Sequence, residues 1–581
     1  MRVMTLPVSE PDRRRLPARV WLRLAINGLM SDPVSALRGL WWTMRRYRVR
    51  GRNLLFAAVR YSPGYYRLWQ EIAERPMLAS LAQGPAGPRI AFVRIPPVAE
   101  VATRVQESAC AADQWWVGVD PNAGATMQDI ARQVCASEPD AWIVPVTAGD
   151  QMSSVLPQAL GHAIVAAGDA EIVYWDHDDL VAGNRTSPWL KPDWDDLLFL
   201  AHDYLSGSCA FRAASLARLA SVDQLAINEQ GLSALSILMA GRTASGEAPP
   251  PLHLPLVLSH RVRGNGDFVL ANRQAALDKF WPEHVQLQQV ASHAGAVEAM
   301  FPSPVVWPKV SIIIPTRDRV DLLRMCTSGL ARTVYPGAIE TIIVDNGSAE
   351  AETQAFFAKL SGNGGKVISA PGEFNFSALN NLAAAQASGD YLLLLNNDVD
   401  VLDEAWLETM MRHALRNNRI GAVGALLLYP SGKVQHAGVA IGLGQAAGHV
   451  YRGIEPEETG HRAMHRTTRK VSAVTAACLL VRRQVYHEVG GLDEVAFKVA
   501  FNDVDFCLKL RRAGYENVFV AAARLVHHES ESRGDDMDAA NLPRFRKELT
   551  ELQERWNTAG ALDPYHHPLF SPSSTDAVLA L

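Results

Sequence analysis

The chain repeats an alternation of short apolar runs with longer amphipathic segments. Residues 89–264 contain four apolar runs that are typical of short buried strands: RIAFVRI, AWIVPV, EIVYW and LPLVLSH. The chain from residue 305 onward contains four more, VSIIIPT, ETIIVD, KVISAP and YLLLL, with helical patterns such as Val320–Thr333 and Phe376–Ala387 between them. Because strands that alternate with helices form parallel sheets, the pattern predicts an α/β protein with a doubly wound sheet.

Changes in pattern divide the chain into five segments. Residues 1–88 have the pattern of basic helices, and residues 89–264 form the first α/β unit. Residues 265–304 have the pattern of a helical linker that ends in the proline-rich PSPVVWP. Residues 305–534 form the second α/β unit, and residues 535–581 form a helical tail.

Length and composition narrow the class of protein. A chain of 581 residues is too long for one core, and its composition is that of a soluble globular protein. Its six cysteines are scattered without a CxxC pair, which is typical of a reducing compartment. The apolar runs fall far short of the ~20 residues of a membrane span, and we expect no secretory signal. The absence of a GxxxxGKS/T motif, and of GxGxxG after the first strand, disfavours P-loop NTPases and dinucleotide oxidoreductases.

Positive charge is concentrated at the beginning of the chain. Residues 1–60 hold thirteen arginines, no lysine and three acids, an excess of ten positive charges. Within Leu37–Tyr47, helical spacing puts five apolar side chains on one face and arginines on the other: Leu37, Leu40, Trp41, Met44 and Tyr47. Such a helix either lies on an anionic membrane surface or packs on its own protein with its arginines in water.

Acidic residues follow the most apolar strand of the chain. Leu392–Leu395 is too apolar to face water on either side, and Asp398 and Asp400 come directly after it. In open α/β sheets, ligands bind outside the carboxyl ends of the strands. Oxygen ligands there favour Mg²⁺ or Mn²⁺ shared with substrate phosphates, although acids also end strands in ordinary loops.

Other candidate residues have a structural and a functional interpretation. Asp345 ends a strand before Asn-Gly-Ser, where it either forms a turn or binds a ribose or base. Asp503 and Asp505 begin an amphipathic helix, where acids cap the helix or act as a general base. His527 and His528 follow an apolar strand and are either structural or metal ligands.

Eight motifs, in this order, resemble those of glycosyltransferase family 2, which has the GT-A fold: VSIIIPTRDR, IIVDNGS, FNFSALNNLAA, GDYLLLLNNDVDV, VTAACLLVRR, GGLDE, FNDVDFCLKLRRAGY and HHESESRG. The resemblance covers residues 305–534 and is closest to bacterial O-antigen and rhamnan-type polysaccharide glycosyltransferases.

The resemblance implies a role for each matching residue. Asp398 matches a metal ligand, with Asp400 a further contributor because Asn396 replaces the first acid of the family's DxD motif. His527 matches the late metal-ligand histidine, with His528 as the alternative, and Asp503 matches the catalytic base. The nucleotide-sugar pocket would be lined by six residues: Pro315, Thr316, Arg317, Asp318, Asp345 and Asn396.

The implied activity is an inverting, metal-dependent glycosyl transfer. A UDP-, dTDP- or GDP-linked sugar would pass to a hydroxyl of a glycan or lipid-linked glycan in surface polysaccharide biosynthesis. Mn²⁺ or Mg²⁺ is the expected cofactor, and no nucleic-acid partner is expected. The expected location is cytoplasmic, peripheral on the inner face of the membrane.

The first α/β unit has a weaker resemblance to the same family. EIVYWDHDDLVAGNRTSPWLKPDW is similar to the middle of such a domain, which puts the acids of 176–179 outside the expected metal position. In the family register only Asp150 remains after the earlier strand, and Glu229–Gly231 contains no aspartate at the base position. We therefore expect two GT-A-like domains, the first of them degenerate.

Two other functions compete with this one. The chain is alternatively a non-catalytic carbohydrate-binding or assembly protein built from two degenerate transferase domains. A nucleotidyltransferase would also use a metal at a sheet edge, but the NDVDF and HHES motifs argue against it through the resemblance.

Overall fold

The computed structural model describes residues 17–581 with these exceptions: 61, 85–86, 96–114, 118–125, 167–168, 220–224, 226, 263–269, 290–296, 363–364 and 529–537. The first sixteen residues of the basic segment and residues 529–530 of HHES thus lie outside the described residues. The chain forms two compact units. Unit 1 is Met1–Leu287, His566–Ser574 and Val578–Leu581, and unit 2 is Gln288–Tyr565 and Thr575–Ala577.

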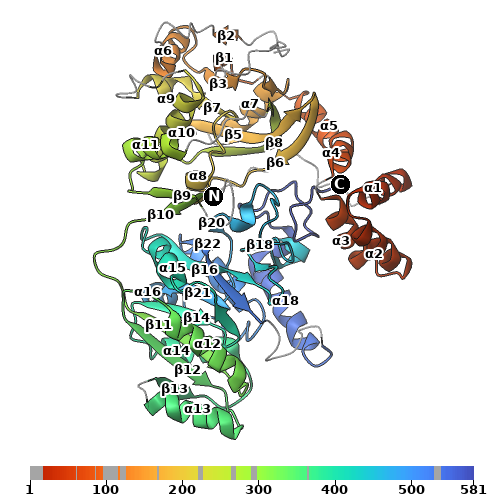
Figure 1. Ribbon diagram of the computed structural model, residues 1–581. Helices are drawn as coiled ribbons and strands as arrows, with labels where there is room; N and C mark the ends of the chain where they lie inside the picture. The colour runs from red at the N-terminus through yellow and green to blue at the C-terminus, as the bar shows by residue number, and fades with distance from the viewer. Residues whose placement is uncertain are drawn as a thin grey trace. The chain divides into compact units, whose positions relative to one another are not determined.

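Unit 1 begins with helices and continues with a mixed α/β layer (Figure 1). Its leading helices are α1 (Ala18–Ser31), α2 (Pro33–Met44), α3 (Arg48–Val59), α4 (Pro63–Trp69), the π-helix η1 (Gln70–Glu74) and α5 (Arg75–Leu81). The α/β layer consists of β1 (Ile90–Ile95), β2 (Trp115–Val117), α6 (Met127–Ser137), β3 (Trp142–Thr147), β4 (Gln151–Met152), α7 (Leu156–Ala166), β5 (Ile172–Val181), β6 (Asn184–Trp189), α8 (Asp196–Ala201), β7 (Cys209–Arg212), α9 (Ala213–Ala217), α10 (Glu229–Ala244), β8 (Leu252–Val262) and α11 (Leu270–Phe280).

The unit 1 strands form one sheet in the order β2-β1-β3-β7-β5-β8-β4, with β6 paired to β5. β1 runs parallel to β2 and β3, and β5 runs parallel to β8, while β7 is antiparallel to both β3 and β5. The carboxyl ends of β1, β3, β5 and β8 therefore share one edge. The apolar runs read from the sequence are buried here, since β3 is buried at every position.

Unit 2 contains the remaining elements. They are β10 (Val297–Met300), β11 (Val310–Thr316), α12 (Val320–Arg332), β12 (Ile339–Asp345), α13 (Ala351–Gly362), β13 (Lys366–Ser369), α14 (Phe376–Ala384), β14 (Tyr391–Leu395), β15 (Val399–Val401), α15 (Trp406–Ala414), β16 (Ile420–Leu428), β17 (Val434–His436), β18 (Val439–Ile441), β19 (Ala447–His449), β20 (Arg469–Val471), β21 (Cys478–Arg482), α16 (Arg483–Glu488), α17 (Asn502–Arg512), β22 (Glu516–His527) and α18 (Leu542–Trp556), with 3₁₀ turns η3 (Leu443–Gln445), η4 (Met464–Arg466) and η5 (Thr558–Gly560).

The unit 2 sheet has the order β13-β12-β11-β14-β21-β16-β22-β15. Its antiparallel β21 lies between β14 and β16 as β7 lies between β3 and β5, so the two sheets repeat one topology. β11 and β14 are buried at every residue because helices cover both faces of a doubly wound sheet. The prediction of an α/β protein with two doubly wound units is confirmed.

Two segments are less helical than the sequence suggested. Within residues 265–304, α11 is followed by a two-stranded sheet of β9 (Gln286–Gln289) and β10, and Pro282, two residues after the end of α11, prevents the helix from continuing. Within residues 535–581, α18 ends at Trp556, before Asn557 with its left-handed φ of 50°, and the rest forms turns and the short η5. No helix in the described part of the chain is long and apolar enough to cross a bilayer.

Candidate active site

The carboxyl edge of the unit 2 sheet brings a carboxylate and a histidine together. Asp398 lies between β14 and β15, and His527 is the last residue of β22. β15 runs antiparallel to β22 and pairs Val399 with His527, which places Asp398 beside the histidine. Oδ1 of Asp398 lies 3.2 Å from Nε2 of His527, and both residues are buried.

Gln435 in β17 determines which ring nitrogen of His527 carries the proton. Its amide oxygen lies 2.8 Å from Nδ1 of His527, and its amide nitrogen lies 3.4 Å from the His527 carbonyl. An oxygen can only accept, so Nδ1 carries the proton and the lone pair of neutral His527 is on Nε2. The amide nitrogen of Asn396 lies 3.2 Å from that Nε2.

This geometry fits a cation. Oδ1 of Asp398 is buried and accepts no hydrogen bond from any described residue, although it faces Nε2 of His527. A buried carboxylate oxygen without a hydrogen-bond donor is stabilised by a positive charge, and a cation that also used Nε2 of His527 would replace the contact from Asn396. One carboxylate oxygen and one imidazole nitrogen suit Mn²⁺ or Mg²⁺ that keeps its remaining positions for phosphates and water.

Asp400 points elsewhere. Its Oδ1 lies 3.6 Å from Nη2 of Arg332 in α12, and its side chain is partly exposed. The structure therefore places Asp398 with His527 but places Asp400 against Arg332.

The residues proposed for the nucleotide lie along the same edge. Thr316 ends β11 and Asp345 ends β12, and the two are paired in register. The Thr316 hydroxyl accepts a hydrogen bond from Asn397 at 2.9 Å, which joins the ends of β11 and β14. Pro315 is buried in β11, whereas Arg317 is exposed directly after it.

Asp345 and Asp318 also shape the loops at this edge. Oδ1 of Asp345 accepts from the Ser348 backbone N–H at 2.8 Å, which is a turn-forming contact. Asp318 accepts from the backbone N–H groups of Ala349 and Glu350 at 2.8 and 2.9 Å, so it ties the loop after β11 to the loop after β12.

The two acids of NDVDF have different surroundings. Asp503 is half-buried at the start of α17, where it accepts from the Ala476 N–H at 3.1 Å. The next residue, Ala477, accepts from the Asn396 N–H at 3.0 Å, so one short segment holds both Asp503 and Asn396. Asp505 is fully buried.

Asp505 has partners in α18 as well as Lys509 of its own helix, 3.4 Å away. Its Oδ1 lies 3.1 Å from Nη1 of Arg555 and accepts from the Trp556 indole at 2.9 Å. Asp505 therefore holds α18 on α17, which leaves Asp503 as the accessible acid of the pair.

Unit 1 repeats the arrangement with different chemistry. Gln151 pairs with His260 as Val399 pairs with His527, so Asp150 and His260 are the topological equivalents of the unit 2 pair. Asp150 is bound by Arg261, with Nε at 3.3 Å, and by the Val262 N–H at 2.9 Å. Burial raises the pKa of Asp150 to about 6 against the opposing effect of Arg261.

His260 is engaged as well. Its Nδ1 lies 2.7 Å from Asp178, which also accepts from Arg185 at 2.6 Å and from the Tyr66 hydroxyl at 2.7 Å. The chain's own arginines thus occupy the carboxylates at the edge of unit 1.

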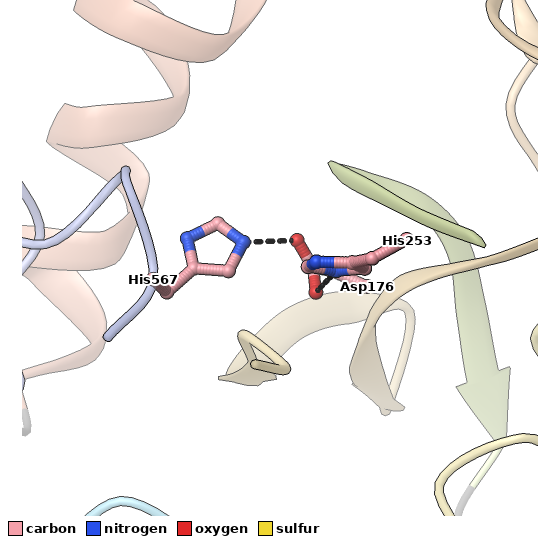
Figure 2. A group of neighbouring side chains, drawn as sticks. All are labelled: Asp176, His253 and His567. Carbon is pink, nitrogen blue, oxygen red and sulfur yellow. Dashed lines mark hydrogen bonds and ion pairs between the residues drawn. The ribbon is translucent and has the colours of Figure 1, made fainter. Parts of the chain in front are cut away.

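A second cluster of potential ligands lies inside unit 1 (Figure 2). It joins Asp176 of β5, His253 of β8 and His567 of the C-terminal segment, and it is the group of three such side chains found among the described residues that can hold a metal ion. Asp176 lies 3.0 Å from Nε2 of His253 and 2.7 Å from Nε2 of His567. Its Oδ1 also accepts from the Lys191 backbone N–H at 2.8 Å.

Hydrogen bonds account for this cluster without an ion. Nδ1 of His567 accepts from the Leu569 N–H at 3.0 Å, so its Nε2 carries the proton and donates to Asp176. A metal bound to that Nε2 would require the proton to be on Nδ1. That proton would then face the Leu569 N–H, and the hydrogen bond between them would be lost. The cluster therefore joins the C-terminal segment to the core of unit 1.

Sequence reasoning did not find Gln435, Arg261 or His567. Each acts through a partner that is distant in sequence, and no spacing in the chain connects the two. The sheet register is the signal that locates the first two, because β17 with Gln435 pairs with β16 beside β22, and β8 with Arg261 pairs with β4.

A carboxylate and a histidine at the carboxyl edge of a doubly wound sheet are groups of the kind with which α/β enzymes hold a cation and a phosphorylated ligand. The family model described as Glycosyl transferase family 2 matches residues 311–490, from β11 past β21. Residues 311–490 therefore match a glycosyltransferase domain of that family, as the motifs predicted.

Relatives extend the similarity beyond the matched domain. The chain is 36% identical over 432 residues to the uncharacterised protein y4gI of Sinorhizobium fredii, covering 72% of this chain and 47% of the relative. It is 34% identical to the O-antigen biosynthesis protein RfbC of Myxococcus xanthus, covering 73% and 33%. It therefore spans less than half the length of these two relatives.

Other similarities are weaker. An N-acetylglucosaminyl-diphospho-decaprenol L-rhamnosyltransferase of Mycobacterium tuberculosis is 26% identical over 217 residues, covering 34% of this chain and 69% of the relative. A solved structure of the mannosyltransferase PcManGT from Pyrobaculum calidifontis, with GDP-Man and Mn²⁺, is 15% identical and covers 46% of this chain and 70% of its own. Its TM-score of 0.34 is too low to specify details of the site.

Proposed function

We propose that unit 2 is an inverting glycosyltransferase that moves a sugar from a nucleotide-sugar to a glycan hydroxyl. The observation that carries the proposal is the buried Oδ1 of Asp398, which accepts no hydrogen bond among the described residues and faces the lone pair of His527. A cation site at a sheet edge is what a diphosphate donor requires, and the family match supports sugar transfer.

Asp398 and His527 would hold Mn²⁺ or Mg²⁺, with Asp400 as the alternative carboxylate and His528 as the alternative histidine. When bound, the cation would neutralise the diphosphate leaving group. The nucleotide would lie over the ends of β11 and β12, where Thr316 and Asp345 are paired. The backbone turns after these strands, with Pro315, Arg317, Asp318 and Asn396, would shape the rest of the pocket.

Asp503 would act as the general base. Its carboxylate takes the proton from the acceptor hydroxyl while that oxygen forms a bond to the anomeric carbon. The bond from the anomeric carbon to the diphosphate oxygen breaks in the same step, so the anomeric configuration inverts. The Ala476 N–H, which donates to Asp503 at 3.1 Å, holds its carboxylate in place at the start of α17.

The relatives' names support a role in surface polysaccharide synthesis with a glycan or lipid-linked glycan acceptor. The donor would be a UDP-, dTDP- or GDP-linked sugar. Such an acceptor would place the enzyme in the cytoplasm, peripheral on the inner face of the membrane. Unit 1 fits the alternative function, non-catalytic binding or assembly, because Arg261 binds the carboxylate that corresponds to Asp398.

Donor turnover tests the proposal. The purified chain is incubated with UDP-, dTDP- and GDP-sugars and Mn²⁺, and release of the nucleoside diphosphate is measured with and without chelator. We expect metal-dependent release with at least one donor, abolished by Asp398→Ala. Binding of donor without release from any of them, with acceptor glycans present, would favour the non-catalytic alternative.

A further inference from the structure

The three leading helices of unit 1, α1, α2 and α3, pack against one another (Figure 1), and their closest contacts are between small residues. Gly39 of α2 and Gly51 of α3 touch so closely that a Cβ added at Gly39 would lie 2.9 Å from the Gly51 carbonyl oxygen. A Cβ added at Gly28 of α1 would lie 3.3 Å from that of Ala36. Ala58 of α3 belongs to the same small cluster as Ala36.

Most large apolar side chains of α1 and α2 face outward instead, although Val20 and Leu24 of α1 are buried. Ten of the 21 exposed large apolar side chains in the described part of the chain fall within 27 residues: Trp21, Leu22, Ile26, Leu29, Met30, Val34, Leu37, Trp41, Met44 and Tyr47. Met30 is 84% exposed and Met44 is 76% exposed. In α2, whose buried residues are the small Ala36 and Gly39, the large apolar residues lie outside, which reverses the arrangement of a helix on a water-soluble protein.

The outward side chains form continuous stripes. In α2, Val34, Leu37, Trp41 and Met44 follow one another at intervals of three and four residues, which puts them on one face. In α1, four more do the same: Leu22, Ile26, Leu29 and Met30. Leu40, which the sequence pattern assigned to this face, is half-buried against the cluster of Ala36 and Leu55.

Basic side chains border the stripes. Arg19, Arg38, Arg45 and Arg46 are exposed, and the Arg45 guanidinium lies 4.2 Å from the centre of the Trp41 ring. Asp32 is the one acid between residues 17 and 47, and it caps α2 by accepting from the Ser35 N–H at 3.0 Å. The face therefore combines apolar area, aromatic side chains and positive charge.

We propose that the outward face of α1 and α2 is a docking surface for an anionic lipid bilayer. Helix packing through small residues is typical where lipid surrounds the helices, because burial of apolar area then gives no drive for them to associate. Tryptophan, tyrosine and arginine beside apolar side chains suit the region between headgroups and acyl chains. The positive charge of this face requires a partner with negative charge, and the headgroups of anionic lipids carry that charge.

The lengths of the helices define the mode of binding. With 14 and 12 residues, α1 and α2 are about 21 and 18 Å long, shorter than the ~30 Å hydrocarbon core. They would lie in the interface, with Met30 and Met44 inserted deepest because they are among the most exposed. This surface specifies how the chain would attach to the membrane at the proposed location. Only the purpose of the attachment rests on the proposed function.

Vesicle co-sedimentation of the full chain tests the surface. Phosphatidylglycerol-rich vesicles are compared with phosphatidylcholine vesicles for the native chain and for Leu37→Glu/Met44→Glu. The matched control is Val305→Glu/Val306→Glu, which changes two side chains that are 101% and 79% exposed outside the helices. All are exposed, so circular dichroism and the melting temperature should be unchanged.

We expect the affinity of the helix variant for anionic vesicles to fall by about tenfold or more. The control should bind like the native chain. Equal binding by both variants, or no binding by the native chain at low salt, would overturn the proposal. A change from dimer to monomer in the helix variant without vesicle binding would make the face a contact between copies. Vesicle binding needs neither donor nor acceptor, so its outcome is separate from that of the transfer assay.

Discussion

The side-chain oxygen of Gln435 lies 2.8 Å from Nδ1 of His527. Because the oxygen can only accept, this contact turns the lone pair of Nε2 toward Asp398, 3.2 Å away. Gln435 is therefore a positioning residue for the proposed cation site, although it touches neither donor nor acceptor in the proposed mechanism.

Replacing Gln435 tests this relationship. Gln435→Leu removes the acceptor, so His527 rotates or changes tautomer, and Mn²⁺ affinity should fall about 10–100-fold. Gln435→Glu, which still accepts, should restore most of it. Mn²⁺ titration by calorimetry or electron paramagnetic resonance measures the effect without donor. Gln386→Leu at an exposed position is the control. Unchanged affinity in Gln435→Leu would remove the positioning role.

Asp398→Ala should separate metal binding from stability. Since its buried Oδ1 accepts no hydrogen bond among the described residues, losing it should not lower the melting temperature of the metal-free protein. The rise in melting temperature with Mn²⁺ should disappear, and transfer should fall by roughly a hundredfold or more. Asp400→Ala is the comparison, because that carboxylate faces Arg332. Loss of metal binding in Asp400→Ala alone would reassign the ligand.

Replacing each of the two acids of α17 should have a different effect. Asp503→Asn keeps the shape but accepts no proton, so kcat should fall roughly 10²–10⁴-fold with donor affinity nearly unchanged. Asp505→Asn loses the charge that faces Arg555 and should instead lower the melting temperature. Steady-state kinetics and thermal unfolding on both variants measure this. A kinetic loss confined to Asp505→Asn would exchange the two roles.

Asp150 should affect stability rather than catalysis. Its folded pKa of about 6 lies above the ~3.9 of an unfolded aspartate, so its protonated form favours the fold and stability falls as pH rises from 4 to 6. Asp150→Asn should therefore be more stable than the native chain at pH 8 and equal to it near pH 4. Denaturant unfolding across this range measures the difference. Transfer by unit 2 should stay within a few-fold, and its loss in a folded Asp150→Asn protein would make unit 1 catalytic.

His567→Ala should lower the stability of unit 1, because it leaves the buried Asp176 without one of its hydrogen-bond partners. Burial opposes the charge of Asp176, but the two histidines hold its pKa below the usual range, and burial lowers the pKa of His567. The contribution of Asp176 to the free energy of unfolding is therefore lost as pH falls below about 4. The contribution of His567 is lost as pH falls below about 6.5. The gap between native and variant, a few kcal/mol at pH 7, should shrink toward pH 4. His566→Ala is the neighbouring control. A gap that grows in acid would contradict the assignment.

The sequence by itself determined the strands and their chemistry. VSIIIPT and YLLLL are apolar on both faces, so they had to be central strands, and β11 matches its predicted bounds residue for residue. Polar residues that end such strands fall at one edge, which is why Asp345 and Asp398 were found from spacing alone. The sequence motifs, too, are local and ordered, so the family was readable without coordinates.

Only the tertiary structure decided how distant side chains pair. Strand register sets Asp398 against His527 and Asp150 near His260, and local sequence does not encode register across a hundred residues. For the same reason Gln435 was missed. Helical periodicity found an apolar face in α2 but not its direction, because the close contact of Gly39 with α3 turns the large side chains outward.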